Sequence, residues 1–224
     1  MLSDHGYHLG DQNHWAKTTN YEQALHIPLI ISGAPIKSKN RKTDALVESV
    51  DVLPTLLDIC GLPILDYLEG TSMVPVLENP EIEWKKAAFS RQPIGSLSEM
   101  YGSSIRTDRY RYVEWKVVDT GEIKAQELYD YEMDHREVYN LVNLPEYKEV
   151  LRELSELLNK GWKASLPDGV INTSKNKPAP LSFASKGEGD YWRKAWVKKY
   201  GGNENMNWKE AMKFKKQYEI KNKE

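Results

Sequence analysis

Residues able to do chemistry gather in the first 30 positions of the chain. Four of the five histidines lie there, together with Asp4, Trp15 and Lys17. A carboxylate beside an imidazole, as in Asp4 and His5, offers two donor atoms to a divalent cation. A lysine ammonium is a compact positive charge that suits an anionic oxygen of a sulfate or phosphate ester. The stretch therefore predicts a site for a metal ion and an oxyanion.

Two donors do not hold an ion firmly, so further ligands are expected from elsewhere. We expect His8, His14 and Trp15 to line the substrate pocket, with Trp15 either stacking on a sugar or packing beneath the loop. Alternatives without a functional site stay open: Asp4 and His5 could simply form part of a turn, and Lys17 could be a solvent-exposed surface charge. The histidines lack the His-x-x-x-His spacing that places two imidazoles on one helix face, so zinc is a minor alternative.

Composition narrows the classes of function. The net charge is −2, which argues against a general nucleic-acid or anionic-membrane surface. No apolar segment reaches the roughly 18 residues of a membrane helix. Cys60 is the only cysteine, so neither an internal disulfide nor a multi-cysteine zinc site is expected. The chain as given is expected to be soluble, and nothing in it resembles an export signal.

The elements around the site loop suggest the edge of an α/β sheet. Met1 and Leu2 are expected to end a strand, and sites in such sheets form beyond the carboxyl ends of strands. Thr19 and Glu22 have the spacing of a capping box for a short helix. Residues 28–33, "PLIISG", predict a buried strand that ends at Gly33.

Residues 47–63, "VESVDVLPTLLDICGLP", are typical of a helix. Pro54 is tolerated if the helix begins near Asp51, and Gly61 suits the position just past its end. One apolar stripe is expected on this helix, made of Val50, Leu53, Leu56, Leu57 and Cys60. Cys60 is interpreted as a small core residue of that stripe.

The pattern changes at Ala87 to antiparallel strands with turns at Asp108 and Gly121. Residues 145–163 predict an amphipathic helix with apolar residues at Val150, Leu151, Leu154, Leu157 and Leu158. We divide the chain into 1–86, the C-terminal part of a catalytic α/β domain; 87–164, an antiparallel subdomain with a covering helix; and 165–224, a linker or surface-wrapping loop followed by a basic helical extension.

These motifs together resemble a known family. "SDHGYHLGDQNHWAKTTNYEQALHIPLII" is similar to the C-terminal catalytic segment of type I sulfatases, most closely the iduronate-2-sulfatase branch. The similarity continues through "SVDVLPTLLDICGLP", "EGTSMVPVL", "GSSIRTDRYRYVEW" and "ELYDYEMDHREVYNLVNLPEY". It covers about residues 1–160 with the motifs in order.

The resemblance implies an alkaline-phosphatase-like α/β fold, hydrolysis of sulfate esters on sulfated sugars such as glycosaminoglycans, and a Ca²⁺ cofactor. By position it makes Asp4 and His5 metal ligands and Lys17 a sulfate contact. His8 and His14 are candidates for leaving-group protonation or sugar contacts. Family members are often periplasmic, secreted or lysosomal, so a periplasmic or secreted location is expected for a full-length member.

The sequence departs from the family at the nucleophile. Family members use a formylglycine that is made from the cysteine of a Cys-x-Pro-Ser-Arg motif. The chain has no such motif, and Cys60 is followed by Gly-Leu-Pro. We therefore expect this chain to be the C-terminal part of a split or truncated sulfatase. It should be inactive alone, and the missing half is expected as its partner. The alternatives are a non-catalytic remnant that binds sulfated glycans, and a phosphate-ester hydrolase of the same superfold.

Overall fold

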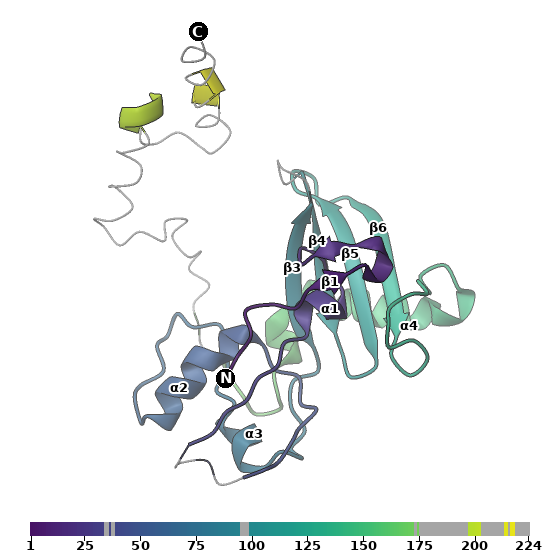
Figure 1. The fold of residues 1–224 in the computed structure, drawn as a ribbon. Coiled ribbons are helices and arrows are strands. Elements are labelled where there is room, and N and C mark those ends of the chain that lie inside the picture. Colours follow the sequence, from purple (N-terminus) through teal and green to yellow (C-terminus); the bar gives the residue numbers. More distant parts are fainter. Residues whose placement is uncertain are drawn as a thin grey trace. The chain divides into compact units, whose positions relative to one another are not determined.

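The computed structural model describes residues 1–33, 36, 39–94, 99–172, 174, 197–202, 213–214 and 216–217. The chain forms two compact units, Met1–Ser174 and Lys175–Glu224. The sheet, its covering helix and the N-terminal loop belong to the first unit (Figure 1).

A four-stranded antiparallel sheet forms the centre of this unit. Its strands are β3 (Ala88–Ile94), β4 (Met100–Arg106), β5 (Tyr110–Val117) and β6 (Ile123–Asp130). They pair in sequence order, and Tyr112 lies opposite Ile105 on one side and Leu128 on the other. The predicted strands and the turns near Asp108 and Gly121 are confirmed.

The hydrophobic core lies between one face of this sheet and helix α4 (Lys148–Lys160). Ile105, Tyr112 and Leu128 are fully buried there. The apolar residues predicted for this helix pack against them: Val150, Leu151, Leu154, Leu157 and Leu158. Gly161, with a φ of 79°, ends α4 in a conformation that glycine adopts without strain. The predicted covering helix is confirmed.

The N-terminal segment crosses the opposite face of the sheet (Figure 1). It carries the short hairpin β1 (His8–Leu9) and β2 (Trp15–Ala16), followed by helix α1 (Glu22–Leu25). Its close approach depends on Gly102 in β4, because a Cβ there would lie 2.3 Å from the Asn20 amide nitrogen. The sheet therefore has one hydrophobic face, covered by α4, and one polar face, covered by the segment that carries the predicted site.

Two predictions for the N-terminal segment are wrong. Thr19 does not cap α1: Tyr21 is the N-cap, and the Glu22 side chain pairs with Arg111 instead of turning back on its own helix. Residues 28–33 are not a buried strand either. Leu29 forms an antiparallel bridge with Leu2, and the Ile30 N–H donates to the Met1 carbonyl at 2.8 Å. The segment therefore pairs with the first residues of the chain, but it is not assigned as a strand and Ile30 is 55% exposed.

Helix α2 (Val52–Ile59) is confirmed, preceded by a 3₁₀ turn, η2 (Ser49–Asp51), and followed by α3 (Val74–Glu78). The interpretation of its apolar stripe is wrong, however. Leu53 is 48% exposed and Cys60 is also exposed. The buried side of α2 is that of Pro54 and Thr55, where the Thr55 hydroxyl accepts the Met73 N–H.

The described part of the predicted linker wraps the first unit. The Ser165 carbonyl accepts the Lys86 N–H, and the Asn172 amide donates to the Gly70 carbonyl. In the second unit, residues 197–200 of the predicted basic helical extension are helical. None of the helices in the described ranges is long and apolar enough to cross a membrane. The boundaries at 86/87 and 164/165 stay predictions.

Acid should destabilise the first unit through two carboxylates. The Arg109 guanidinium lowers the pKa of Asp130. Burial raises the pKa of Asp134, but bonds from the Tyr139, Arg136 and Val138 N–H groups outweigh this and lower it. Because both folded pKa values are depressed, the stabilisation is full above the unfolded pKa of about 3.9 and is lost as pH falls through the folded values.

We therefore expect the free energy of unfolding, measured with urea, to decline below about pH 4. Asp130→Asn should flatten that decline. A slope unchanged by Asp130→Asn would contradict the assignment.

Candidate functional site

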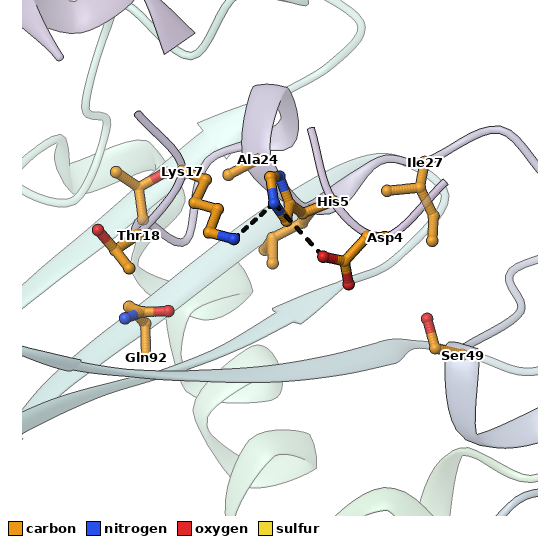
Figure 2. A pocket seen from close by; sticks show the side chains of 10 residues that line it. Asp4, His5, Lys17, Thr18, Ala24, Ile27, Ser49 and Gln92 are labelled. Atoms are coloured by element: carbon orange, nitrogen blue, oxygen red, sulfur yellow. Dashed lines mark hydrogen bonds and ion pairs between the residues drawn. The ribbon is translucent and has the colours of Figure 1, made fainter. Parts of the chain in front are cut away.

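A pocket of about 290 Å³ lies where the N-terminal loop meets the sheet edge. Its polar lining comes from Asp4, His5, Lys17, Thr18, Thr19, Ser49 and Gln92. Figure 2 shows the neighbouring Asp4 and His5 side chains on one part of the loop and Lys17 pointing toward them from another. The structure thus brings together three of the residues that the sequence singled out, and their roles remain a proposal.

The hydrogen bonds of His5 define which ring nitrogen faces the pocket. Its Nδ1 lies 2.7 Å from the Gly6 carbonyl oxygen, which can only accept, so Nδ1 carries the proton. Nε2 is then an acceptor, and the Lys17 Nζ lies 2.6 Å from it. An Asp4 oxygen lies 3.5 Å from the same nitrogen. The Nε2 lone pair of His5 therefore accepts from the Lys17 ammonium, beside the Asp4 carboxylate.

The turn that carries this pair depends on Gly6. Its N–H donates to the Ala24 carbonyl of α1 at 2.9 Å. A Cβ on this residue would lie 1.8 Å from the Gln23 carbonyl oxygen, so no other residue fits without moving α1. The sequence Asp-His-Gly is thus a local requirement: two polar side chains for the pocket, and a glycine that lets them approach the helix.

The other predicted site residues do not line the pocket themselves, although His8 contacts the lining residue Thr19. His8 is fully buried, and its Nε2 lies 2.8 Å from the Thr19 hydroxyl. The His14 ring lies 5.7 Å from the His8 ring, in a group of rings that includes Tyr21. Trp15 is 72% exposed on the hairpin, close to Gly10.

A divalent cation would find only part of its ligands here. Calcium takes about six to eight oxygen ligands, and no group of three or more His, Cys, Asp or Glu able to hold a metal occurs among the described residues. The Asp4 carboxylate suits a hard cation. The His5 orientation, with Nδ1 held by a carbonyl, is the arrangement found in metal-binding histidines. The chain therefore offers two donors, and they do not form a calcium site by themselves.

Several site residues were missed by sequence reasoning. Ser49 and Gln92 reach the pocket from η2 and β3, and nothing in their spacing links them to the N-terminal loop. Arg111 did carry a signal, because it alternates with the core residue Tyr112 and so had to lie on the other face of its strand.

Comparison with known proteins identifies a family that matches most of the first unit. Residues 10–164 match the family described as N-sulphoglucosamine sulphohydrolase, C-terminal. An N-acetylglucosamine-6-O-sulfatase from Bacteroides thetaiotaomicron is 31% identical over 74% of this chain and 30% of its own length. Other relatives are named arylsulfatase or arylsulfatase K. These names differ from the iduronate-2-sulfatase branch that the motifs suggested.

Solved structures resemble the chain over a similar extent. One, described as a complex with its substrate D-glucosamine-2-N,6-O-disulfate, is 30% identical, with a TM-score of 0.64 over 73% of this chain and 33% of that one. A phosphonate monoester hydrolase of Agrobacterium radiobacter is 26% identical, with a TM-score of 0.63 over 71% and 33%.

The chain thus spans about a third of the length of the relatives and solved structures that it matches. The matching family region includes Lys17, the N-terminal helix, the antiparallel sheet and α4. The chain belongs to the sulfatase family, over its C-terminal region.

Proposed function

We propose that this chain forms the C-terminal part of a sulfatase site, in which Lys17 holds a sulfate-ester oxygen. The observation that supports this most directly is the convergence of Lys17, His5 and Asp4 in one pocket. The Lys17 ammonium is a preorganised positive group in the pocket that complements an oxyanion, and the Asp4 carboxylate beside it complements a cation. Asp4 and His5 would then be two of the ligands of a divalent cation, with calcium as the expected ion.

A bound cation would offset charge on the sulfuryl oxygens. The residues of this chain do the rest of the positioning: Lys17 orients the ester, and His5 is held with its lone pair toward the pocket by its own Nδ1–H. The formylglycine nucleophile and the remaining ligands would come from a polypeptide segment outside this sequence, which has no Cys-x-Pro-Ser-Arg. An alkaline-phosphatase-like fold for the whole assembly is part of this proposal.

Sulfated sugars are the proposed substrates. The relative named N-acetylglucosamine-6-O-sulfatase and the solved complex with D-glucosamine-2-N,6-O-disulfate support this class. Trp15, exposed on the hairpin, remains our proposed platform for a sugar ring. His8 and His14 do not line the pocket themselves, and His8 reaches it only through the Thr19 hydroxyl, so a direct role for either requires the loop to rearrange.

Substitution of Lys17 tests the proposal without requiring turnover. We expect Lys17→Met to weaken binding of D-glucosamine-2-N,6-O-disulfate to the purified chain by about tenfold or more, since hydrogen bonds to charged groups contribute about 1.5–3 kcal/mol. The measurement is an NMR titration. Lys124→Met is the control, because Lys124 pairs with Glu122 at an exposed site outside the pocket lining. Equal affinities for the two variants would contradict the proposal.

A chromogenic sulfate ester provides the second test. The purified chain should show no turnover, since the nucleophile motif is absent. Reading the coding DNA before Met1 then asks where the nucleophile lies. An in-frame or adjacent Cys-x-Pro-Ser-Arg supports a split sulfatase, whereas unrelated sequence favours a remnant that only binds sulfated glycans.

Phosphoryl chemistry is a second candidate. The similarity to a phosphonate monoester hydrolase favours it, and a lysine-based oxyanion pocket does not by itself distinguish sulfuryl from phosphoryl oxygens. Comparing turnover of matched sulfate and phosphate esters by the reassembled enzyme separates the two. A preference for the phosphate ester would replace the sulfatase assignment.

A further inference from the structure

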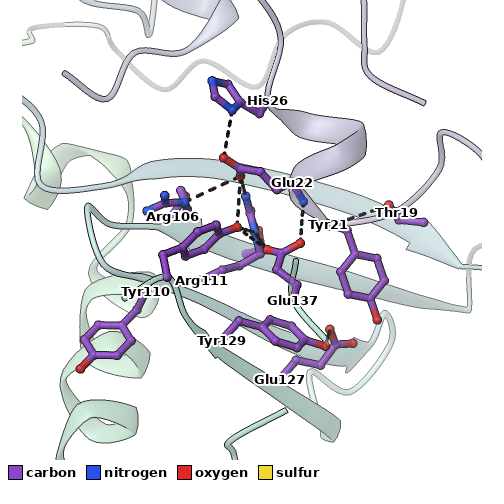
Figure 3. Close-up of polar contacts among 12 residues, drawn as sticks. Thr19, Tyr21, Glu22, His26, Arg106, Tyr110, Arg111, Glu127, Tyr129 and Glu137 are labelled. Atoms are coloured by element: carbon purple, nitrogen blue, oxygen red, sulfur yellow. Dashed lines mark hydrogen bonds and ion pairs between the residues drawn. The ribbon is translucent and has the colours of Figure 1, made fainter. Parts of the chain in front are cut away.

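A buried polar cluster lies beneath α1, on the face of the sheet opposite the hydrophobic core. We name it the Arg111 cluster, after its central residue in β5. Figure 3 shows its side chains converging from the N-terminal helix, from the sheet and from the loop after β6. Its members are Glu22, Arg106, Arg111, Tyr131 and Glu137.

Glu137 ties the sheet to the start of α1. One of its carboxylate oxygens, Oε1, accepts the Arg111 Nε–H at 2.5 Å and also accepts the Tyr131 hydroxyl at 2.5 Å. The other, Oε2, accepts the backbone N–H of Glu22 at 2.7 Å. The Arg111 Nη2 in turn donates to the Glu22 carboxylate. A single carboxylate therefore holds both the guanidinium and the first residue of the helix.

The cluster is far more buried than surface ion pairs are. The side chains of Arg111 and Glu137 are 2% and 0% exposed. Burial opposes the charge of Arg111, but the neighbouring Glu137 and Glu22 carboxylates outweigh it and raise the pKa of the guanidinium. Buried charges of this kind are tolerated only when each is paired, and removal of one partner leaves the other uncompensated.

The backbone of Glu137 is itself held in an unfavourable conformation. Its φ is 53°, in the left-handed region where glycine would fit without strain. The Asp134 carboxylate accepts the N–H groups of Val138 and Tyr139 at 2.6 and 2.8 Å and so fixes the loop around it. Strain of this kind persists where the surroundings over-determine it, often at functional sites. Glycine would relieve it here but would lose the carboxylate.

A short series of contacts through α1 connects the Arg111 cluster to the pocket. Ala24 and Leu25 of α1 line the pocket. The Ala24 carbonyl accepts the Gly6 N–H, and the Gly6 carbonyl accepts the His5 Nδ1–H. A shift of α1 would therefore move the residue that orients His5 toward Lys17.

We infer that Glu137 and Arg111 are positioning residues for the pocket: from the antiparallel sheet they fix α1, and α1 fixes the turn that presents His5 to Lys17. This inference deepens the proposed function, and it rests on that proposal only for what the pocket binds. The geometric claim is separate, because it concerns the Gly6–Ala24 contact in the absence of any anion.

Amide hydrogen exchange of the full chain, read by NMR, tests this claim. We expect Glu137→Gln to speed exchange of the Gly6 amide at least tenfold relative to the β4 amides. Glutamine keeps one acceptor oxygen, and its NH₂ group, which only donates, must face either the Arg111 Nε–H or the Glu22 N–H. Glu114→Gln is the matched control. Glu114 is an equally buried carboxylate on β5, but it accepts from Tyr112 and from Ser155 of α4, on the other face of the sheet.

A purely structural role predicts a different result. Glu137→Gln would then destabilise the whole chain, and exchange at Gly6 and in β4 would rise together, as in Glu114→Gln. That outcome, or an unchanged Gly6 amide, overturns the inference. If Glu137→Gln fails to fold, Tyr131→Phe removes only the hydroxyl contacts to Glu137, Glu22 and Arg111 and leaves the Arg111–Glu137 pair in place. It should raise the Gly6 ratio about threefold, and an unchanged ratio there also overturns the inference.

The binding titration keeps the two proposals apart. Faster Gly6 exchange in Glu137→Gln with no effect of Lys17→Met on sugar affinity would refute the proposed function and keep the positioning role. The reverse pattern would refute the positioning role alone. If both hold, Glu137→Gln should also weaken binding of D-glucosamine-2-N,6-O-disulfate about as much as Lys17→Met does.

Discussion

Replacing Lys85 with methionine is expected to lower the free energy of unfolding by about 3–5 kcal/mol, the usual result of breaking a buried ion pair. The Lys85 side chain is 2% exposed. Its Nζ lies 2.8 Å from Glu48 Oε2 and 2.8 Å from both oxygens of Asp51. Methionine fills a similar volume but leaves two carboxylates facing one another in the interior without a cation.

The neighbouring lysine is a matched control. Lys86 is 57% exposed, and its Nζ lies 3.8 Å from Asp168. Lys86→Met should change the free energy of unfolding by no more than about 0.5 kcal/mol, as exposed substitutions usually do. Urea unfolding followed by circular dichroism gives both values. Similar losses for the two variants would show that the Lys85 pair contributes no more than a surface contact.

The expected damage of Lys85→Met extends to local structure. Asp51 also accepts the Thr71 N–H and the Glu48 N–H, and so closes the turn that leads into α2. Because Ser49 in that turn lines the pocket, we expect chemical shifts of the pocket residues to change as well.

Gly6→Ala has the second of the two largest expected effects. An added methyl would lie 1.8 Å from the Gln23 carbonyl oxygen, a backbone atom that cannot move without α1. Overpacking of this kind costs about 1–3 kcal/mol and occasionally more. Here the displaced part is the Asp4–His5 turn itself. We therefore expect binding of the sulfated sugar to fall below detection as well as a loss of stability.

Gly121→Ala separates steric clash from backbone strain. Gly121 has a φ of 70°, but nothing lies within 4 Å of a Cβ built there. It should cost about 1–2 kcal/mol from left-handed strain alone and leave sugar binding unchanged. Normal binding by Gly6→Ala would show that the turn adapts and that its close approach to α1 is not required.

The antiparallel half of the first unit was predictable because its signals are local. Alternation along residues 110–117, turn residues at Asp108 and Gly121, and the period of 150–158 each determine an element by themselves. Residues 28–33 and the stripe on α2 were misjudged for the opposite reason. Hydrophobicity indicates that a face is suited to burial. Whether the face is covered depends on segments that lie far away in the sequence.

The candidate site was predictable only where its members are neighbours in sequence. Asp4, His5 and Lys17 lie within one loop, and the structure does bring them together. His8 was grouped with them by the same closeness, yet the hairpin turns its ring into the interior against Thr19. Glu137 contributes to the start of α1 from 115 residues away, and no spacing rule reaches across such a separation.

The exposed stripe of α2 affects how stability experiments on this chain should be designed. Val50, Leu53 and Leu56 are each about half exposed in the folded state. Dyes that fluoresce on apolar surfaces usually report loosened, molten-globule-like states. Here they should bind the intact fold as well, so a thermal-shift assay would begin with high fluorescence and give a weak transition. A bright dye signal from this protein should therefore not be taken as a sign of misfolding unless near-ultraviolet ellipticity is lost too.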